Sequence, residues 1–237
     1  MSGRYGYRML TIEKATDGSR IDDIKAFIAE KTFPCVGAKS ALNKNRMRLS
    51  QFGSLASPDS TRSLWKALIR YSQEFPDPGS SPVSFVAVFD NVETDELGFE
   101  KLVWQQLQAL HDFDCENGIV WDPRVNDDPT QADFSFSVGG RAFFVVGLHP
   151  GASRMARRTP FPCIVFNFHD QFESLKASGK YSSMQDAIRS RDTALQGSVN
   201  PVLARFGDSS EAIQYSGRAV ESDWKCPFHA QASRSGK

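Results

Sequence analysis

The sequence predicts an α+β (mixed α/β) fold, a single domain with a mixed, partly antiparallel sheet flanked by helices. Three observations support this class. Short segments of β-branched and aromatic residues alternate with longer segments of helical periodicity. Two strand-like segments are separated only by Gly139-Gly140, which is the pattern of an antiparallel hairpin. The 237 residues contain no internal repeat and no long linker, and they are enough for one substantial core.

Amphipathic helices are predicted where apolar residues recur every three or four positions. The pattern is clearest over 95–114, where the recurring residues are Phe99, Leu102, Val103, Leu107, Leu110 and Phe113. Ser19 or Asp22 can cap the first helix, Ser57 or Asp59 can cap the second, and Gly197 is typical of a helix end. The predicted helices cover 19–31, 57–75, 95–114, 170–179 and 182–197.

Strands are predicted where short apolar or alternating segments are bounded by turn residues. Polar and aromatic residues alternate over 132–138, whereas 141–148 is almost entirely apolar and predicts a more deeply buried partner. The predicted strands cover 82–90, 132–138, 141–148 and 162–168. We interpret 1–237 as one domain, with the N-terminal segment 1–18 and the tail 230–237 expected to be flexible.

The charge balance predicts neither a nucleic-acid partner nor a membrane partner. Lys and Arg number 28 and so do Asp and Glu, and proteins that bind nucleic acid or anionic membranes usually carry a basic excess. The longest apolar runs have six or seven residues, far fewer than a membrane span needs. The N-terminus has no apolar stretch of the secretory kind, and Cys35, Cys115, Cys163 and Cys226 have no disulfide-framework spacing. We therefore expect a soluble cytoplasmic protein with reduced thiols.

The segment FFVVGLHPGASRMARR, residues 143–158, is the first candidate site. His149 follows an apolar strand and precedes Pro150-Gly151, which is a good position for a ligand or a base; the alternative is a histidine bonded to turn backbone. Arg154, Arg157 and Arg158 lie within one or two turns of a helix predicted after Gly151. They can clamp carboxylates or a phosphate, or form a solvated basic face.

Three further motifs carry potential chemistry. Cys35 in FPCVGAKSAL, near Lys39, is either a nucleophile or iron ligand, or a buried structural cysteine. His169 follows a strand beside Asp170 and Glu173; a helix-capping Asp170 and a surface histidine are the alternative. The CPFH segment at 226–229 offers two zinc ligands but needs a second pair, for which only isolated cysteines such as Cys35 or Cys163 remain.

Six blocks occur in a characteristic order and spacing: FPCVGAKSAL, FEKLVWQQLQALHDFD, FFVVGLHPGASRMARR, PCIVFNFHDQFESL, LQGSVNP and WKCPF. With these blocks the chain resembles the YqcI/YcgG family over residues 30 to 229. Members of known activity in that family are haem-dependent N-oxygenases. They hydroxylate or further oxidise side-chain nitrogens of free amino acids, in pathways to cycloserine, guanitoxin and nitro-amino-acid natural products.

The resemblance implies haem b as the cofactor and a small-molecule amine or guanidine as the substrate. It favours His149 as the catalytic axial ligand of the haem iron, with Cys35 and His169 as the alternative ligands. The haem would occupy a Phe-rich pocket, and Arg154, Arg157 and Arg158 would bind its propionates. The reaction also needs an external electron donor or peroxide.

A cationic substrate nitrogen needs a carboxylate partner, for which Glu100, Asp112 and Glu173 are candidates, Glu173 as a catalytic residue. Asn167 and Asn200 are candidates for binding the α-amino or carboxylate group of the substrate. Two other classes stay open: a non-catalytic haem carrier or sensor, and a zinc-stabilised interaction protein using the CPFH segment. The sequence does not specify the oligomeric state.

Overall fold

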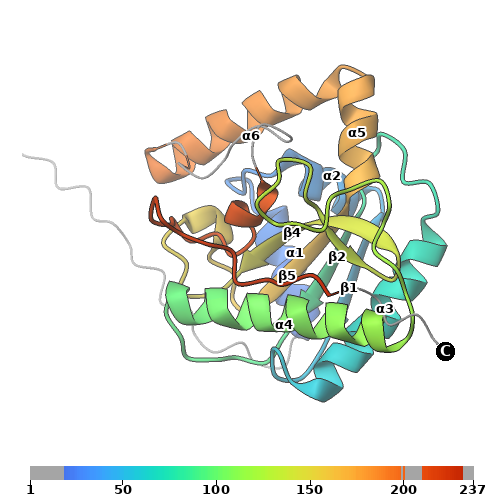
Figure 1. Cartoon of the computed structure of the whole chain (residues 1–237). Coiled ribbons are helices and arrows are strands. Elements are labelled where there is room, and N and C mark those ends of the chain that lie inside the picture. Colours follow the sequence, from blue (N-terminus) through green and yellow to red (C-terminus); the bar gives the residue numbers. More distant parts are fainter. Residues whose placement is uncertain (1–18, 199, 201–209, 232–237) are drawn as a thin grey trace, which may run out of the picture.

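The computed structural model describes residues 19–198, 200 and 210–231. The predicted flexible segment 1–18, and all of the predicted tail except 230 and 231, lie outside these residues. The described residues form one five-stranded sheet in the order β1-β2-β5-β4-β3, flanked by helices (Figure 1), which confirms the predicted α+β class. The strands are β1 (Met47–Gln51), β2 (Ser84–Val88), β3 (Phe136–Val138), β4 (Arg141–Leu148) and β5 (Cys163–Phe168).

The sheet is mixed, as the sequence predicts. Only β1 and β2 run parallel; the β2–β5, β5–β4 and β4–β3 pairs are antiparallel. The predicted hairpin joins β3 to β4, with Val138 opposite Arg141. Gly139 and Gly140 both have positive φ, 65° and 73°, the backbone conformation that a two-residue hairpin turn of the primed type requires and that glycine adopts without strain.

The helices form where the apolar periodicity predicts them, with one addition. Ser57 accepts a hydrogen bond from the Ser60 amide at the start of α3, and Asp95 accepts one from the Gly98 amide at the start of α4. Gly197 ends α6 in the left-handed conformation. The α-helices are α1 (Arg20–Ala29), α2 (Val36–Asn43), α3 (Pro58–Glu74), α4 (Glu96–Glu116), α5 (His169–Ala177) and α6 (Lys180–Gln196).

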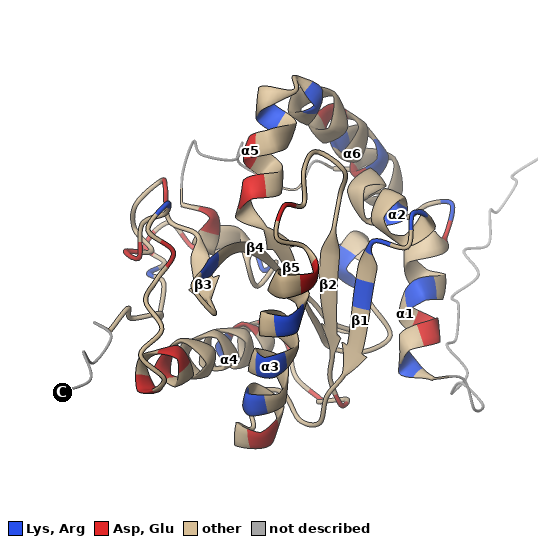
Figure 2. Ribbon diagram, turned by 90° about the vertical axis from the view of Figure 1, so that its right-hand side faces the viewer, with Lys and Arg blue, Asp and Glu red and all other residues tan. Residues whose placement is uncertain are grey.

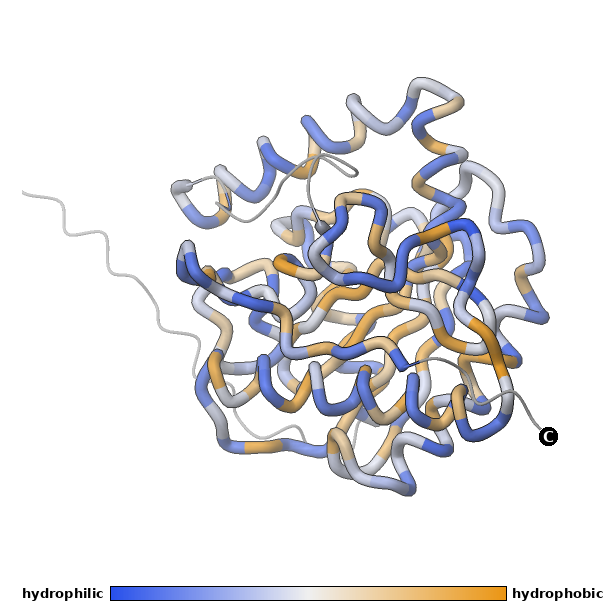
Figure 3. Tube along the Cα trace, viewed as in Figure 1, coloured by the Kyte–Doolittle hydropathy of each residue, from blue (hydrophilic) through white to orange (hydrophobic). Residues whose placement is uncertain are grey.

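Two apolar cores pack against opposite faces of the sheet. One contains the buried faces of α3 and α4 together with Tyr215 and Phe228 of the C-terminal segment. The other joins Ile24 and Ile28 of α1 to the opposite side chains of β2, β4 and β5. Figure 2 shows α1 and α2 on one side of the strands and α3 and α4 on the other, and Figure 3 shows that hydrophobic residues concentrate in the central strands.

Two predicted elements are shorter in the structure. The strand predicted over 132–138 is shorter, because β3 begins at Phe136 and Phe134 makes only an isolated bridge with Asn126. The helix predicted after Gly151 is a three-residue 3₁₀ helix, η1 (Met155–Arg157). A second 3₁₀ helix, η2 (Glu211–Gln214), leads into a segment that crosses β4.

Gly147 is where that segment approaches β4 most closely. Its amide donates to the Tyr215 carbonyl over 2.6 Å, and a Cβ on Gly147 would lie 2.9 Å from both the Tyr215 oxygen and Cε1 of Phe99. We expect Gly147→Ala to lower the free energy of unfolding by about 1–3 kcal/mol, because neither backbone nor ring can move freely. Urea titration measures this, with Gly37→Ala as the control since its Cβ would meet nothing closer than 3.7 Å. If Gly147→Ala and Gly37→Ala have the same free energy of unfolding, the close approach of the Tyr215 segment to Gly147 would be contradicted.

Candidate active-site cavity

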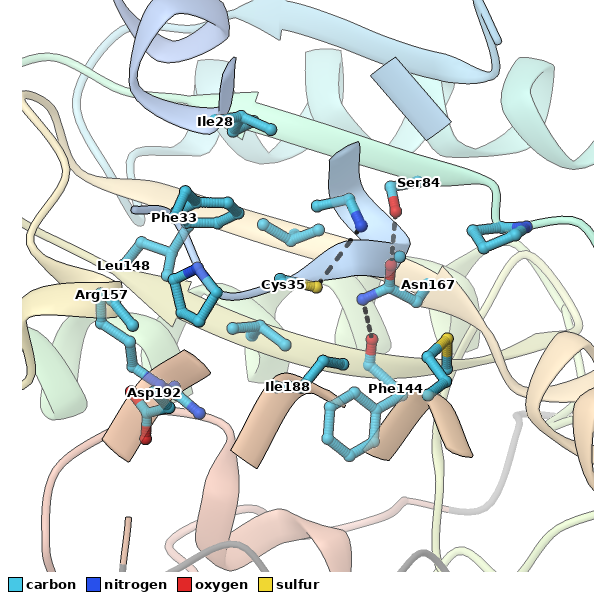
Figure 4. Close-up of a pocket in the computed structure, with 18 of the residues that line it drawn as sticks. Ile28, Phe33, Cys35, Ser84, Phe144, Leu148, Arg157, Asn167, Ile188 and Asp192 are labelled. Carbon is cyan, nitrogen blue, oxygen red and sulfur yellow. Dashed lines mark hydrogen bonds between the residues drawn. The ribbon is translucent and has the colours of Figure 1, made fainter. Parts of the chain in front are cut away.

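A cavity of about 300 Å³ lies between the sheet and α6, on the face that α1 and α2 cover. Strand alternation directs Phe144, Val146 and Leu148 of β4 into it, and Ile28 and Phe33 close another wall (Figure 4). Its lining is mainly apolar with a few polar groups, and its volume is at the lower end of small-molecule sites. This is the combination expected of a ligand site.

Cys35 presents its sulfur to the centre of this cavity (Figure 4). The residue is the N-cap of α2, where its Sγ accepts a hydrogen bond from the Ala38 amide over 3.4 Å. Burial raises the pKa of the Cys35 thiol. A Cβ on Gly37 would be 3.9 Å from the Cys35 sulfur and 3.7 Å from the Met184 sulfur, so α2 and α6 each bring a sulfur atom to this part of the cavity.

Asn167 lies on β5, on the cavity floor beside Cys35 (Figure 4). Its Oδ1 accepts from the Ser84 hydroxyl over 2.7 Å, and its Nδ2 donates to the Phe144 carbonyl over 3.4 Å. These bonds hold the amide in one orientation. Asn200, the other predicted substrate-binding asparagine, also lines the cavity and is 7% exposed.

A buried charged cluster closes one end of the cavity. Arg154 pairs with Asp192 of α6 and also donates to the hydroxyl and carbonyl oxygens of Ser198, over 3.0 and 2.9 Å. Arg157 lies beside Asp192 (Figure 4), and the only hydrogen bond that its side chain makes to a described residue is from Nη1 to the Gly147 carbonyl, over 3.2 Å. Burial lowers the pKa of Arg157 to about 10.

Helix α6 forms the cavity roof, and this role is not evident from the sequence. The side chains that line the cavity lie on one face, at the spacing of successive helical turns: Tyr181, Met184, Gln185, Ile188, Arg189 and Asp192. Asp192 is therefore a site residue that sequence reasoning missed. The spacing of the sequence does indicate it, because Asp192 lies four residues after Ile188 and eight after Met184, and these three residues share one face of a helix.

His149 does not line the cavity. Leu148 faces the cavity, so the next residue turns to the opposite side of the sheet, where the His149 ring stacks on Phe99 of α4 with ring centres 4.2 Å apart. His149 is 3% exposed, and burial lowers the pKa of its imidazole. None of the other histidines, His111, His169 and His229, lines the cavity either, as far as the described residues extend. His149 as the iron ligand stays a prediction.

The remaining predicted residues lie elsewhere. Arg158 donates to the Ala152 carbonyl over 2.9 Å, outside the cavity. Glu100 is buried in the other core, where its carboxylate accepts from Arg218 over 2.9 Å and from Trp224 over 3.1 Å. Glu173 is exposed on α5 beside Lys176; Asp112 on α4 and His169 at the start of α5 also lie outside the cavity. The structure thus brings Cys35, Arg154, Arg157, Asn167 and Asn200 together, and it separates them from His149, Arg158, Glu100, Glu173 and Asp112.

The CPFH segment shows no metal cluster in the described part of the chain. Cys226 packs against the α4 core, where burial raises its pKa to about 12, whereas His229 is exposed. Cys35 and Cys163 belong to the core on the opposite face of the sheet. Across residues 19–198, 200 and 210–231, no three His, Cys, Asp or Glu side chains are grouped as metal ligands would be.

The described residues define a single-sheet α+β protein with one mainly apolar cavity between the sheet and α6. The chain belongs to the YqcI/YcgG family, whose pattern it matches over residues 24–229. It is 26% identical over 211 residues to the "Uncharacterized protein YqcI" of Bacillus subtilis (strain 168). The aligned residues cover 84% of this chain and 81% of that protein. No solved structure matches the chain. None of the described helices is both long and apolar enough to span a membrane.

Proposed function

We propose that the protein is a haem-dependent N-oxygenase that hydroxylates or further oxidises an amine or guanidine nitrogen of a free amino acid or related small molecule. The site is the cavity beneath α6, which would hold haem b. The observation that supports the proposal best is one apolar cavity containing both a sulfur donor, Cys35, and a buried guanidinium, Arg157. The family resemblance supplies the reaction class.

The chemistry of the residues that line the cavity suits a haem group. Phe33, Phe144 and Phe172 provide flat apolar contacts, and the guanidinium of Arg157 suits a propionate. Cys35 would hold the iron, in place of the predicted His149, because its sulfur faces the cavity and the His149 ring lies across the sheet. Bound haem would supply the activation of oxygen or peroxide.

Cys35 must lose its proton to bind iron as thiolate. Burial raises the pKa of this thiol, so the proton is held more tightly than in a free cysteine. We therefore expect the affinity for haem to increase as the pH rises.

The other cavity residues would bind and orient the substrate and exclude water from it. Asp192 is the carboxylate that lines the cavity among the described residues, and it takes the role predicted for Glu100, Asp112 and Glu173. A carboxylate offers about four acceptor sites, so Asp192 can accept from the cationic α-amino group of the substrate while bonded to Arg154. Asn167 and Asn200 would donate to, or accept from, the remaining polar groups.

The absorption spectrum of protein produced with a haem precursor tests the proposal. We expect an intense Soret band that is lost or shifted in Cys35→Ala and retained in His149→Ala. Cys163→Ala is the matched control, because Cys163 is a buried cysteine of β5 that does not line the cavity. A band altered only in His149→Ala would contradict Cys35 as the ligand, and the absence of any band would contradict the proposal.

Turnover separates the enzyme from the non-catalytic carrier or sensor. Haem-loaded protein is incubated with arginine or lysine and either a reductant with oxygen or peroxide, and the N-oxidised amino acid is detected by mass spectrometry. We expect Asp192→Asn to reduce the product strongly, since it removes the cavity carboxylate. Haem binding without an N-oxidised product from any amine or guanidine tried would indicate the carrier.

A further inference from the structure

Arg157 is a buried cation with almost all of its hydrogen-bonding capacity unused. Its residue is 8% exposed, and the side chain packs against Gly217, where a Cβ would lie 2.4 Å from Nη1. A guanidinium carries five N–H donors, yet within the described residues Arg157 makes one side-chain hydrogen bond, to the Gly147 carbonyl. Burying a charged group is costly unless it is paired.

The local charges do not balance. Arg154 and Arg157 face one carboxylate, Asp192, and Arg154 is the residue that forms the ion pair with it. In the described part of the chain, no carboxylate lies within 4.0 Å of the Arg157 guanidinium. Among the described residues, the cluster of Arg154, Arg157 and Asp192 therefore contains one more positive than negative charge at the end of an apolar cavity.

We infer that the guanidinium of Arg157 binds the carboxylate of the cavity's ligand, whose apolar part then extends past Ile188 and Phe33 toward Cys35 (Figure 4). A guanidinium matches a carboxylate with two parallel N–H···O bonds, and a dry site strengthens them. The inference rests on the proposed function only in taking this cavity as the ligand site. It does not assign the ligand's carboxylate to Arg154, which is paired with Asp192, or to Arg158, which lies outside the cavity.

The carboxylate can come from two sources, a haem propionate or the α-carboxylate of an amino-acid substrate. Each source has a neutral counterpart of nearly the same shape. Haem is compared with its dimethyl ester by absorption titration of the haem-free protein. L-Arginine is compared with L-argininamide, in which a neutral amide replaces the carboxylate, by the spectral change each causes in the haem-loaded protein.

A third pair of probes needs no haem. Decanoate and decanol share an apolar chain, and the stabilisation each gives to the haem-free protein is measured by thermal unfolding. This arm keeps the inference testable if the protein binds no haem, so the failure of the proposed function and the failure of the Arg157 assignment are distinguishable.

We expect the carboxylate to bind roughly 10- to 100-fold more tightly than its neutral counterpart, as a charge-assisted hydrogen bond contributes in a buried site. Arg157→Met keeps the apolar stem and should abolish this difference. Arg158→Met is the matched control, because the neighbouring arginine donates only to backbone carbonyls. Circular dichroism melts show whether the Arg157→Met protein has folded. The comparison of each carboxylate with its neutral counterpart on the unaltered protein does not depend on any variant.

The three arms have definite outcomes. A difference confined to haem and its ester assigns the carboxylate to a propionate, and one confined to arginine and argininamide assigns it to the substrate. A difference for decanoate alone supports a carboxylate subsite without haem. The inference is overturned if no carboxylate exceeds its neutral counterpart in the unaltered protein, or if the preference persists in a folded Arg157→Met variant.

Discussion

Replacing Glu211 by glutamine is expected to make the protein more stable above pH 8 and less sensitive to pH below it. Glu211 begins η2 and is 4% exposed. Its Oε1 accepts hydrogen bonds from the Tyr215 hydroxyl over 2.5 Å and from the Ser135 hydroxyl over 2.7 Å. No cation pairs with it in the described residues, and burial raises its pKa to about 8.

The sign of the effect follows from the two protonation states. Glu211 keeps its proton in the folded protein up to about pH 8, whereas an exposed glutamate loses it near 4.5. The stabilising contribution of the bound proton is therefore complete below about pH 4.5 and is lost as the pH rises through 8. Within that window the cost is on the order of 1 kcal/mol per pH unit. Glutamine keeps the accepting oxygen and carries no charge.

Urea unfolding from pH 5 to 9 measures the prediction. Burial raises the pKa of Asp114 to about 6 and lowers the pKa of His111 and His149, so these groups also make stability depend on pH. The informative quantity is therefore the difference between the unaltered protein and Glu211→Gln at each pH. We expect the advantage of the variant to grow steadily up to pH 8 and then to level off. Parallel stability curves would show that Glu211 is not a neutral acid in the folded protein.

Removing the Glu100 carboxylate should cause the largest loss of stability among single substitutions of the predicted site residues. Glu100 and Arg218 form an ion pair in which the side chains are 6% and 12% exposed. Trp224 also donates to the carboxylate, over 3.1 Å. Breaking one partner of a buried pair leaves a buried charge and typically costs 3–5 kcal/mol. We expect about 3 kcal/mol for Glu100→Ala, at the lower end because Glu221 still pairs with Arg218.

Thermal and urea unfolding of Glu100→Ala, Glu100→Gln and Glu116→Ala test this prediction. Glutamine retains an acceptor for Trp224 and should give an intermediate loss. Glu116 is exposed at the last residue of α4, so its substitution should leave stability nearly unchanged. If Glu100→Ala is as stable as Glu116→Ala but binds ligand poorly, the substrate role predicted from the sequence would replace the structural one.

Local patterns were sufficient for most of the secondary structure. The apolar residues of α4 recur at helical spacing, and the cap residues Ser57 and Asp95 lie where the amides of α3 and α4 need acceptors. The Gly139-Gly140 pair predicts the β3–β4 hairpin because few other residues tolerate both left-handed positions. Each of these features depends on residues close together in the chain.

Two elements were not predicted because their local signals are weak. Helix α2 has eight residues, slightly more than two turns, so the apolar periodicity within the FPCVGAKSAL block is too short to predict a helix. Strand β1 carries Arg48, Ser50 and Gln51 at the edge of the sheet, and its pairing with β2 decides its structure. Both elements are stabilised by packing against distant parts of the chain.

The sequence by itself determined the fold class, most helices and strands, and the blocks that identify the family. Only the tertiary structure decided which candidate residues share a site. A strand alternates its side chains between two faces, so Leu148 and His149, adjacent in the chain, lie in different cores. Cys35 and Asp192, 157 positions apart, line one cavity because α2 and α6 both pack on the same side of the sheet. Which face each strand buries depends on the whole sheet and its helices, and no local pattern contains that information.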